Sequence, residues 1–213
     1  ACFVMKKVIY PLSYRVFRNR PYEKTCAQMR NFTLSRDNDT EDEVWFLDHL
    51  PVFTIGKLGK LDNLLFHTQI PVVQSDRGGD ITYHGPGQLV VYLLLDLARR
   101  NLGIRQLVSL IEETLICLLS SYGVRASTME QAPGIFVGRK KIGFLGLRVR
   151  RGKTYHGFSL NIDMDLSPFT IINPCGYEGL EVTDLKALGK STEMKVVVDD
   201  IKAILDFKLS KLA

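Results

Sequence analysis

Long apolar segments are missing from this sequence of 213 residues. The longest uninterrupted apolar run, residues 89–95, is far shorter than the ~18 residues that a membrane-spanning helix needs. It has the length of a buried strand instead. The N-terminal stretch also lacks the order of a signal peptide, in which basic residues precede the apolar run. We therefore expect a protein without a membrane partner, located in the cytoplasm.

Cysteine is scarce as well, and the four cysteines form no CxxC pair. This spacing argues against a disulfide framework or a zinc ribbon. Cys26 and Cys117 fall in segments with helical periodicity, so we expect both to be buried packing residues. Cys175 differs, because it stands between a proline and a glycine in a stretch without periodicity. From the residues alone it is either a structural cysteine or a reactive thiol.

Signatures for phosphate and metal binding are absent too. Neither GxxxxGK[ST] nor GxGxxG occurs, and Asp184 stands where the first glycine would precede Gly189 and Lys190. The four histidines show neither HxxxH nor HExxH spacing. The sequence therefore predicts no cofactor and no metal.

The net charge of +5 is modest, but basic residues gather in 138–141 and 148–153. These stretches are either a solvated strand face or a docking surface for an acidic partner. Few aromatic residues lie between the charges, so nucleic-acid binding is not predicted.

Strands outnumber helices in the pattern of apolar residues. Apolar spacing of three to four residues predicts helices over 21–36, 105–122 and 193–211. Strands are expected over 6–12, 44–50, 52–56, 71–76, 89–97, 134–138, 141–150 and 154–165. Several strands are joined by short turns, which favours an α+β fold with a mixed or antiparallel sheet over alternating βαβ units. We see no repeat or low-complexity linker and expect one domain over 1–213.

Two further stretches carry residues suited to chemistry. Residues 77–88, RGGDITYHGPGQ, contain four glycines between expected strands, and form either a tight hairpin or a loop that approaches a ligand closely. His84 within this stretch suits a catalytic base, a metal ligand or a turn residue. Lys140 and Lys141 begin a strand, so one of them is expected to face inward. An inward lysine that loses proton affinity can serve as a base.

Together these stretches resemble one family. RGGDITYHGPGQ, the later KIGFLGLRVRRGKTYHGFSLNIDMDLSPFTIINPCGYEG and the upstream HLPVFTIGK are similar to the lipoyl(octanoyl) transferases of lipoate biosynthesis. The resemblance covers about residues 20–185. It implies the fold of the biotin and lipoate protein ligases, which is an α+β fold with a mixed β-sheet core, a smaller second sheet and flanking helices.

The resemblance also implies roles by position. Cys175, in the NPCG motif, would form an acyl-thioester intermediate, and Lys141, which opens KI, would stabilise the thiolate and relay protons. Phe144 stands where relatives often have a small residue, which leaves the preferred acyl length open. The implied substrate-binding residues are Arg77, Gly78, Gly79, Asp80, Ile81, Thr82, Tyr83, His84, Phe144, Leu145, Gly146, Gly157, Phe158 and Ser159.

The reaction implied by the resemblance moves an octanoyl group from octanoyl-acyl carrier protein to a lysine of apo lipoyl domains. The acceptors would be the lipoyl domains of 2-oxoacid dehydrogenases and the glycine cleavage H protein. Exchange of one thioester for another needs no ATP, in agreement with the missing phosphate loop. Acidic partners would suit the two basic stretches.

Three rival interpretations remain. An ATP-dependent lipoate or biotin ligase would share the fold, but the GRGRxGR-type loop of biotin ligases is absent and Cys175 would be idle. A cysteine hydrolase would pair Cys175 with His84 or His156. A non-catalytic acyl-binding module would tolerate replacement of Cys175.

Overall fold

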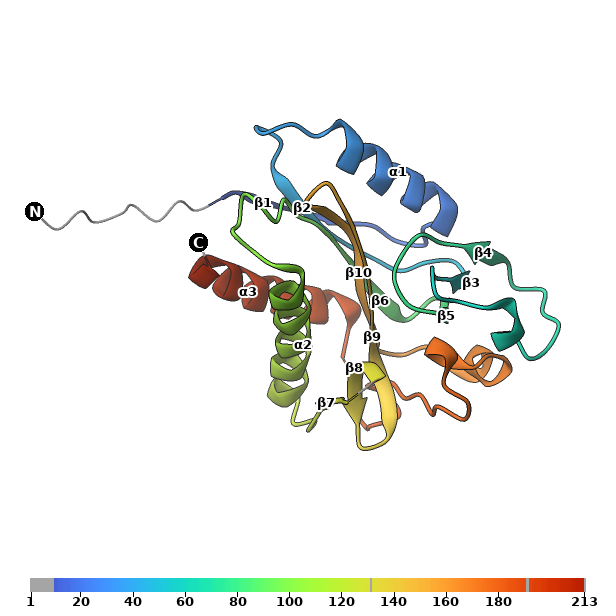
Figure 1. The fold of residues 1–213 in the computed structure, drawn as a ribbon. Coiled ribbons are helices and arrows are strands. Elements are labelled where there is room, and N and C mark those ends of the chain that lie inside the picture. The colour runs from blue at the N-terminus through green and yellow to red at the C-terminus, as the bar shows by residue number, and fades with distance from the viewer. Residues whose placement is uncertain (1–9, 131, 191, 213) are drawn as a thin grey trace, which may run out of the picture.

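The large sheet of the protein is mixed. The structure, a computed structural model, describes residues 10–130, 132–190 and 192–212. Within these residues, strand β1 runs parallel to β2, and every other pair of neighbours in this sheet is antiparallel. The seven strands, in spatial order, are β1 (Leu12–Val16), β2 (Asp42–Leu47), β6 (Gln88–Leu94), β10 (Lys153–Asn161), β9 (Lys140–Arg150), β8 (Ala132–Val137) and β7 (Ser127–Met129) (Figure 1).

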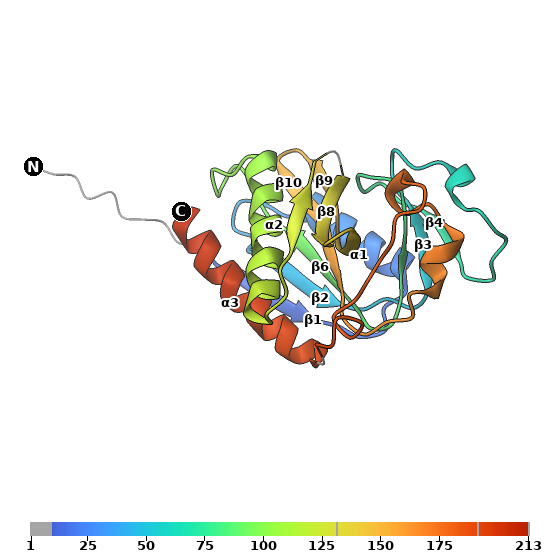
Figure 2. The same ribbon diagram turned by 90° about the horizontal axis from the view of Figure 1, so that it is seen from below.

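A second, three-stranded sheet lies beside the first (Figure 2). Strand β3 (Val52–Ile55) is central, with β4 (Val72–Gln74) parallel on one side and β5 (Ile81–His84) antiparallel on the other. Three short 3₁₀ helices are η1 (Leu61–Asn63), η2 (Ser167–Ile171) and η3 (Pro174–Gly176). The predicted α+β fold with a mixed core and a smaller second sheet is confirmed.

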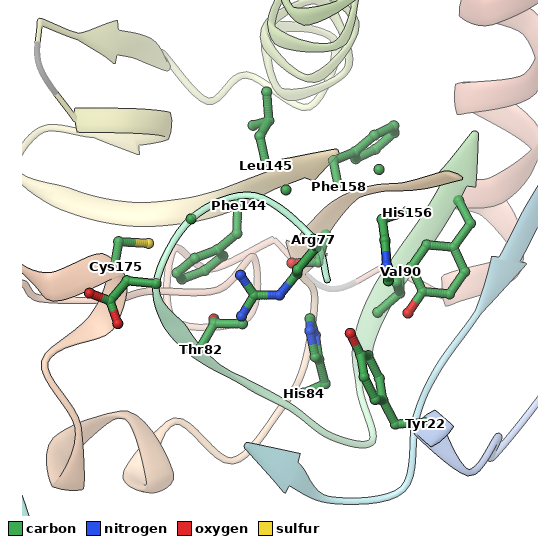
Figure 3. A pocket seen from close by; sticks show the side chains of 16 residues that line it. Tyr22, Arg77, Thr82, His84, Val90, Phe144, Leu145, His156, Phe158 and Cys175 are labelled. Atoms are coloured by element: carbon green, nitrogen blue, oxygen red, sulfur yellow. The ribbon is translucent and has the colours of Figure 1, made fainter. Parts of the chain in front are cut away.

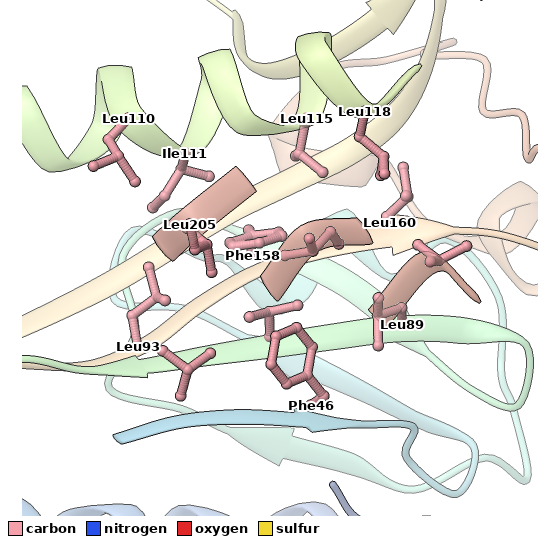
Figure 4. Packing of buried hydrophobic residues seen from close by; sticks show 14 of the residues in the cluster. Phe46, Leu89, Leu93, Leu110, Ile111, Leu115, Leu118, Phe158, Leu160 and Leu205 are labelled. Atoms are coloured by element: carbon pink, nitrogen blue, oxygen red, sulfur yellow. The ribbon is translucent and has the colours of Figure 1, made fainter. Parts of the chain in front are cut away.

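Helices cover both faces of the large sheet (Figures 1 and 2). Helices α2 (Ile104–Ser121) and α3 (Met194–Leu212) pack on one face, and α1 (Tyr22–Ser35) packs on the other. Strand residues alternate between these faces. Val44, Phe46, Leu89, Val91 and Leu93 join the α2–α3 core shown in Figure 4, and Trp45, Leu47, Val90, Tyr92 and Leu94 join the α1 core. The α1 face also adjoins the second sheet, so a ligand site can form between them.

All three helices begin and end within one residue of their predicted bounds, but the predicted bounds of the first strand were wrong, and part of the stretch predicted as a hairpin or loop is a strand. The first described strand is Leu12–Val16 rather than 6–12, because Pro11 has no N–H for a sheet and the alternating residues follow it; residues 6–9 lie outside the described residues. The stretch 77–88 is not a loop throughout, since β5 occupies 81–84.

Two cysteines, Cys26 and Cys117, were expected to be buried, and only one of them is partly so. Cys117 is exposed, because it lies on the face of α2 that points away from the sheet, so the prediction of a buried residue was wrong. Cys26 is half-buried and packs against the α1 core. Burial raises the pKa of Cys26 to about 11, so this thiol is unreactive near neutral pH.

A search of the described residues finds no helix that is both long and apolar enough to cross a membrane.

Candidate active site

A slot opens between the large sheet, β5 and the start of α1 (Figure 3). It encloses about 460 Å³ of empty space, including its mouth. Both sheets and α1 contribute lining side chains, so the slot exists only in the complete fold. Its lining residues are Tyr22, Arg77, Gly79, Asp80, Thr82, His84, Val90, Tyr92, Phe144, Leu145, Gly146, His156, Gly157, Phe158, Ser159 and Cys175.

Cys175 lies at one end of this slot, on η3 (Figure 3). Its backbone is left-handed, with φ 57° and ψ 20°, and Gly176 follows with φ 77°. Gly176 N donates to Asn173 O at 2.9 Å, and Asn173 N donates to Asn63 O at 2.8 Å. The positive φ favours glycine at this position, and a Cβ there would also lie 2.8 Å from Asp80 Oδ2. Such strained turns are common at functional sites.

Lys141 is the second residue of β9 and its side chain is completely buried, whereas Lys140, the first residue, is exposed. This confirms that one of the two lysines faces inward. Lys141 Nζ donates to Cys175 Sγ at 3.2 Å and also to Pro133 O. It lies 4.9 Å from the centre of the Phe144 ring. Within the described chain, Lys141 forms no ion pair with a carboxylate, so a thiolate on Cys175 would be its nearest counter-charge.

Glycine and backbone pairing hold Lys141 in place. A Cβ on Gly134, whose φ is 136°, would lie 2.3 Å from Lys141 Cε. Lys141 N donates to Glu181 O, and Thr183 N donates to Lys141 O, both at 2.9 Å. These bonds join the segment that follows Cys175 to the strand that carries Lys141.

The side chains of strand β5, within the predicted glycine-rich stretch, point alternately into two environments. Thr82 and His84 line the slot, whereas Ile81 and Tyr83 point into a second core with Phe53. This alternation is the ordinary period of a strand. Ile81 and Tyr83 therefore support the slot without lining it.

Ahead of β5, Arg77 and Gly78 tie the stretch to its neighbours. The buried Arg77 guanidinium donates to Thr54 O at 2.6 Å and to Gly78 O at 2.9 Å. Gly78 N donates to Leu147 O at 2.9 Å and does not line the slot. Arg77 thus fixes the slot wall from the small sheet, and Gly78 fixes it from β9.

The β9–β10 residues form the other wall. The Phe144 ring stacks on Phe169, with ring centres 5.4 Å apart and an interplanar angle of 11°. Phe144 is 5% exposed and lines the slot, so its ring narrows the space beside Cys175. A Cβ on Gly157 would lie 2.2 Å from Val91 O, so glycine there permits close contact between β10 and β6.

Four slot residues were missed by the sequence analysis: Tyr22, Val90, Tyr92 and His156. Tyr22 lies in the predicted helix 21–36, and its ring stacks on His84 at 5.9 Å. His156 was considered only as a partner for Cys175 in a hydrolase. His156 directly precedes Gly157, Phe158 and Ser159, which were predicted to bind substrate, and this position could have indicated that His156 lines the slot.

The histidines bond to groups other than Cys175. His84 Nδ1 donates to Gln88 Oε1 at 2.6 Å, and His156 Nε2 lies 2.9 Å from Asp76 Oδ1. Burial lowers the pKa of both histidines, so both rings are neutral at pH 7. The described side chains also contain no group of three or more His, Cys, Asp or Glu placed to hold a metal ion.

The two-sheet architecture with a slot on the second-sheet side defines a class of fold. It is similar to a crystal structure of lipoate-protein ligase A bound with ATP, with a TM-score of 0.76 at 15% identity, over 95% of this chain and 86% of that chain. It is also similar to biotin protein ligase from Aquifex aeolicus, with a TM-score of 0.56 at 12% identity, over 95% of this chain and 71% of that chain. The chain has the lipoate/biotin protein ligase-like fold.

Sequence comparison is more specific. The profile of the lipoyl protein ligase A/B catalytic domain matches residues 21–206, and the chain belongs to this family. An octanoyltransferase of Pseudomonas entomophila is 55% identical over 178 residues, which cover 84% of this chain and 83% of the relative. An octanoyltransferase of Hahella chejuensis is 51% identical over 191 residues, or 90% and 85% of the two chains. The predicted resemblance to octanoyltransferases and the prediction of an enzyme are confirmed.

Proposed function

We propose that this enzyme moves an octanoyl group from octanoyl-acyl carrier protein, through a thioester on Cys175, to a lysine of an apo lipoyl domain. The observation that carries the proposal is the 3.2 Å contact between Lys141 Nζ and Cys175 Sγ at one end of the slot. Octanoyltransferase relatives at 50–55% identity support the acyl group. The whole chain, 1–213, acts as one catalytic domain in this proposal, in the cytoplasm.

In the first half-reaction, the Cys175 thiolate attacks the carbonyl carbon of the donor thioester. The bond between that carbon and the donor sulfur breaks, and the carrier leaves as a thiolate. This thiolate then takes up the proton that Cys175 gave up. Lys141 stabilises the thiolate, since a cation at hydrogen-bond distance favours the charged form of a thiol. One thioester replaces another, so no ATP is consumed.

In the second half-reaction, the amine of the acceptor lysine attacks the acyl carbon on Cys175. A C–N bond forms, the C–S bond to Cys175 breaks, and the proton lost by the amine passes through Lys141 to the Cys175 sulfur, which restores the starting enzyme. The product is an amide, which is more stable than the thioester, and this difference drives the cycle. Acceptors in this proposal are the lipoyl domains of 2-oxoacid dehydrogenases and the glycine cleavage H protein.

The slot gives the acyl chain an apolar path. Phe144, Leu145 and Phe158 line it, and each buried methylene of the chain contributes ~0.8 kcal/mol. An octanoyl chain therefore gains several kcal/mol from burial. The Phe144 ring lies against the slot, so we expect this residue to affect the preferred chain length.

The basic stretches provide a docking surface for acidic partners in this proposal. Lys140 pairs with Glu181 at 3.7 Å and Lys153 with Asp96 at 3.3 Å, so part of the charge is compensated within the chain. Arg139, Arg150 and Arg151 are exposed. These arginines are the residues that we expect to contact the carrier protein or the lipoyl domain.

Intact-protein mass after mixing with octanoyl-acyl carrier protein, without ATP, tests the proposal. We expect an octanoyl adduct on the wild type and none on Cys175→Ala, because the adduct is a thioester on that sulfur. Cys175→Ala should lower the melting temperature little, since the thiol is only partly buried at the edge of the core around Phe53. Acylation that appears only with ATP and free octanoate would favour a ligase instead.

A further inference from the structure

The end of the slot opposite Cys175 is polar. Figure 3 shows Tyr22, His84 and His156 on the side of the slot away from Cys175. A plain hydrocarbon chain has no atom that can hydrogen-bond to them. The chemistry that suits this end depends on which ring nitrogens carry a proton.

A chain of hydrogen bonds sets the proton on His84. Asn161 Nδ2 donates to the backbone carbonyl of Thr183 at 3.0 Å, so Asn161 Oδ1 faces Gln88 and accepts from Gln88 Nε2 at 2.9 Å. Gln88 Oε1 must then accept from His84 Nδ1, at 2.6 Å. Burial lowers the pKa of His84, so the neutral ring holds its one proton on Nδ1. His84 Nε2 is therefore a bare acceptor.

His156 also has one ring nitrogen without a proton, for a separate reason. Its Nε2 lies 2.9 Å from the Asp76 carboxylate, which can only accept, so Nε2 carries the proton. The hydrogen bond from His156 keeps the pKa of Asp76 low, and burial lowers the pKa of His156. His156 Nδ1 is thus also an acceptor, and it has no partner among the described side chains and backbone.

The backbone of His156 is strained in a way that serves this arrangement. Its φ of 60° is left-handed, which is rare for a non-glycine residue in a strand. As a result, the adjacent residues Tyr155 and His156 both reach Asp76, which strict strand alternation would prevent. Strain of this kind tends to occur at functional sites.

Two tyrosine hydroxyls at this end already have partners. The Tyr22 hydroxyl bonds to Ser75 at 2.7 Å, and the Tyr92 hydroxyl bonds to His49 at 2.7 Å. Thr82 and Ser159 line other parts of the slot wall, and their hydroxyls have no partner in the described part of the chain. Buried polar groups are normally hydrogen-bonded. Two bare imidazole nitrogens therefore remain for a ligand at this end.

We propose that this end of the slot is a hydrogen-bonding subsite for a terminal hydroxyl, so that the enzyme binds ω-hydroxylated medium-chain acyl groups as well as octanoyl. The inference rests on the acyl slot of the proposed function. The hydroxyl donates to His84 Nε2 or His156 Nδ1 and takes no part in bond formation at the carbonyl. A terminal carboxylate has no proton to donate to either nitrogen, and the Arg77 guanidinium that lines the slot already donates to Thr54 and Gly78, so the subsite favours the hydroxyl over the carboxylate.

Calorimetry can measure the binding of three unreactive amides to the wild-type chain. Because these amides undergo no acyl transfer, the measurement tests the subsite separately from catalysis. The ligands are octanamide, 8-hydroxyoctanamide and 7-carboxyheptanamide. We expect the hydroxylated ligand to bind within about threefold of octanamide or more tightly, since the hydrogen bond replaces lost hydration. The carboxylated ligand should bind at least about tenfold more weakly. Weaker binding of the hydroxylated ligand by about tenfold, the penalty of an unpaired hydroxyl, would overturn the proposal.

Two variants test whether His84 is the residue that binds the terminal hydroxyl. His84→Phe keeps an aromatic ring against Tyr22 but removes the acceptor, and should lower the affinity for 8-hydroxyoctanamide relative to octanamide about tenfold. His49→Phe is the matched control, because His49 is buried nearby with both nitrogens bonded and does not line the slot. An equal change of the affinity ratio in both variants would argue against the subsite. Failure of octanoyl transfer with an intact binding preference would reject the proposed function and leave the subsite standing.

Discussion

At the scale of single residues, Gly134 sets the position of the Lys141 amine. We expect Gly134→Ala to slow acylation of Cys175 about tenfold or more, because the new Cβ would lie 2.3 Å from Lys141 Cε and 2.7 Å from Gly143 O, so the lysine and the pairing of β8 with β9 must both shift. The rate of acyl-enzyme formation, followed by intact-protein mass, measures the effect. Gly138→Ala is the control for a Cβ added at a positive φ, because its φ is 60° and nothing lies within 4 Å of the added Cβ. Equal slowing in both variants would show that the position of Lys141 is not responsible.

Lys141 itself offers a direct test of thiolate stabilisation. We expect Lys141→Ala to slow alkylation of Cys175 by iodoacetamide at pH 7, since the thiolate loses the cation that lies 3.2 Å away. The rate of alkylation at Cys175, resolved by peptide mass, measures this change. Lys140→Ala removes the neighbouring charge, which is exposed and pairs with Glu181, and should leave the rate unchanged. An unchanged rate in Lys141→Ala would remove this residue from the role.

At the scale of elements, a buried carboxylate joins three segments. Asp42, at the start of β2, is fully buried and accepts from Arg36 Nη2, just after α1, at 2.5 Å. It also accepts from Arg100 Nε and from Asp96 N, after β6. Two buried guanidinium groups therefore share one carboxylate, and these bonds hold the end of α1 and the turn after β6 against the large sheet.

Asp42→Ala should lower the free energy of unfolding by about 3–5 kcal/mol, because it leaves two buried arginines without their counter-charge. Urea denaturation at pH 7 measures the loss. The control is Asp163→Ala, which breaks the exposed Asp163–Lys186 pair and should cost at most about 1 kcal/mol. A loss below about 1 kcal/mol for Asp42→Ala would mean that water already solvates the arginines.

Elements with a strong local pattern were predictable from the sequence. Helix α2 has a continuous apolar stripe and α1 begins after Pro21, and both lie within one residue of their predicted bounds. Strand β5 was missed because Thr82, Tyr83 and His84 stand among glycines, and only pairing with β3 makes the segment extended. Strand β1 was misplaced for a similar reason, since its partner β2 fixes its register.

The candidate site could also be predicted from the sequence only in part. The resemblance to octanoyltransferases implied that Cys175 and Lys141 belong to one site, and the structure puts their side chains at hydrogen-bond distance. Tyr22 and Tyr92 could not be predicted there, because the contact between α1 and the α1 face of the sheet comes from tertiary packing. Sequence motifs report the residues near the chemistry, whereas the far end of the slot depends on the assembled fold.

At the scale of the whole molecule, three buried neutral histidines make the fold sensitive to acid. Burial lowers the pKa of His49 to about 4 and also lowers that of His84 and His156. The rings of His49 and His84 lie 5.8 Å apart, between the large sheet, α1 and the second sheet. Protonation of either ring would place a charge where these layers meet.

The free energy of unfolding should therefore fall as the pH drops from about 6.5 to about 4. An unfolded histidine takes up a proton near 6.5, whereas folded His49 resists it to about 4, so His49 alone accounts for about 3 kcal/mol that is present above pH 6.5 and lost below it. Urea denaturation at pH 7 and pH 5 measures the slope. His49→Gln should reduce the slope, and His67→Gln, at an exposed position, should leave it unchanged. Equal unfolding free energies at the two pH values would show that the buried rings are protonated or hydrated in the folded chain.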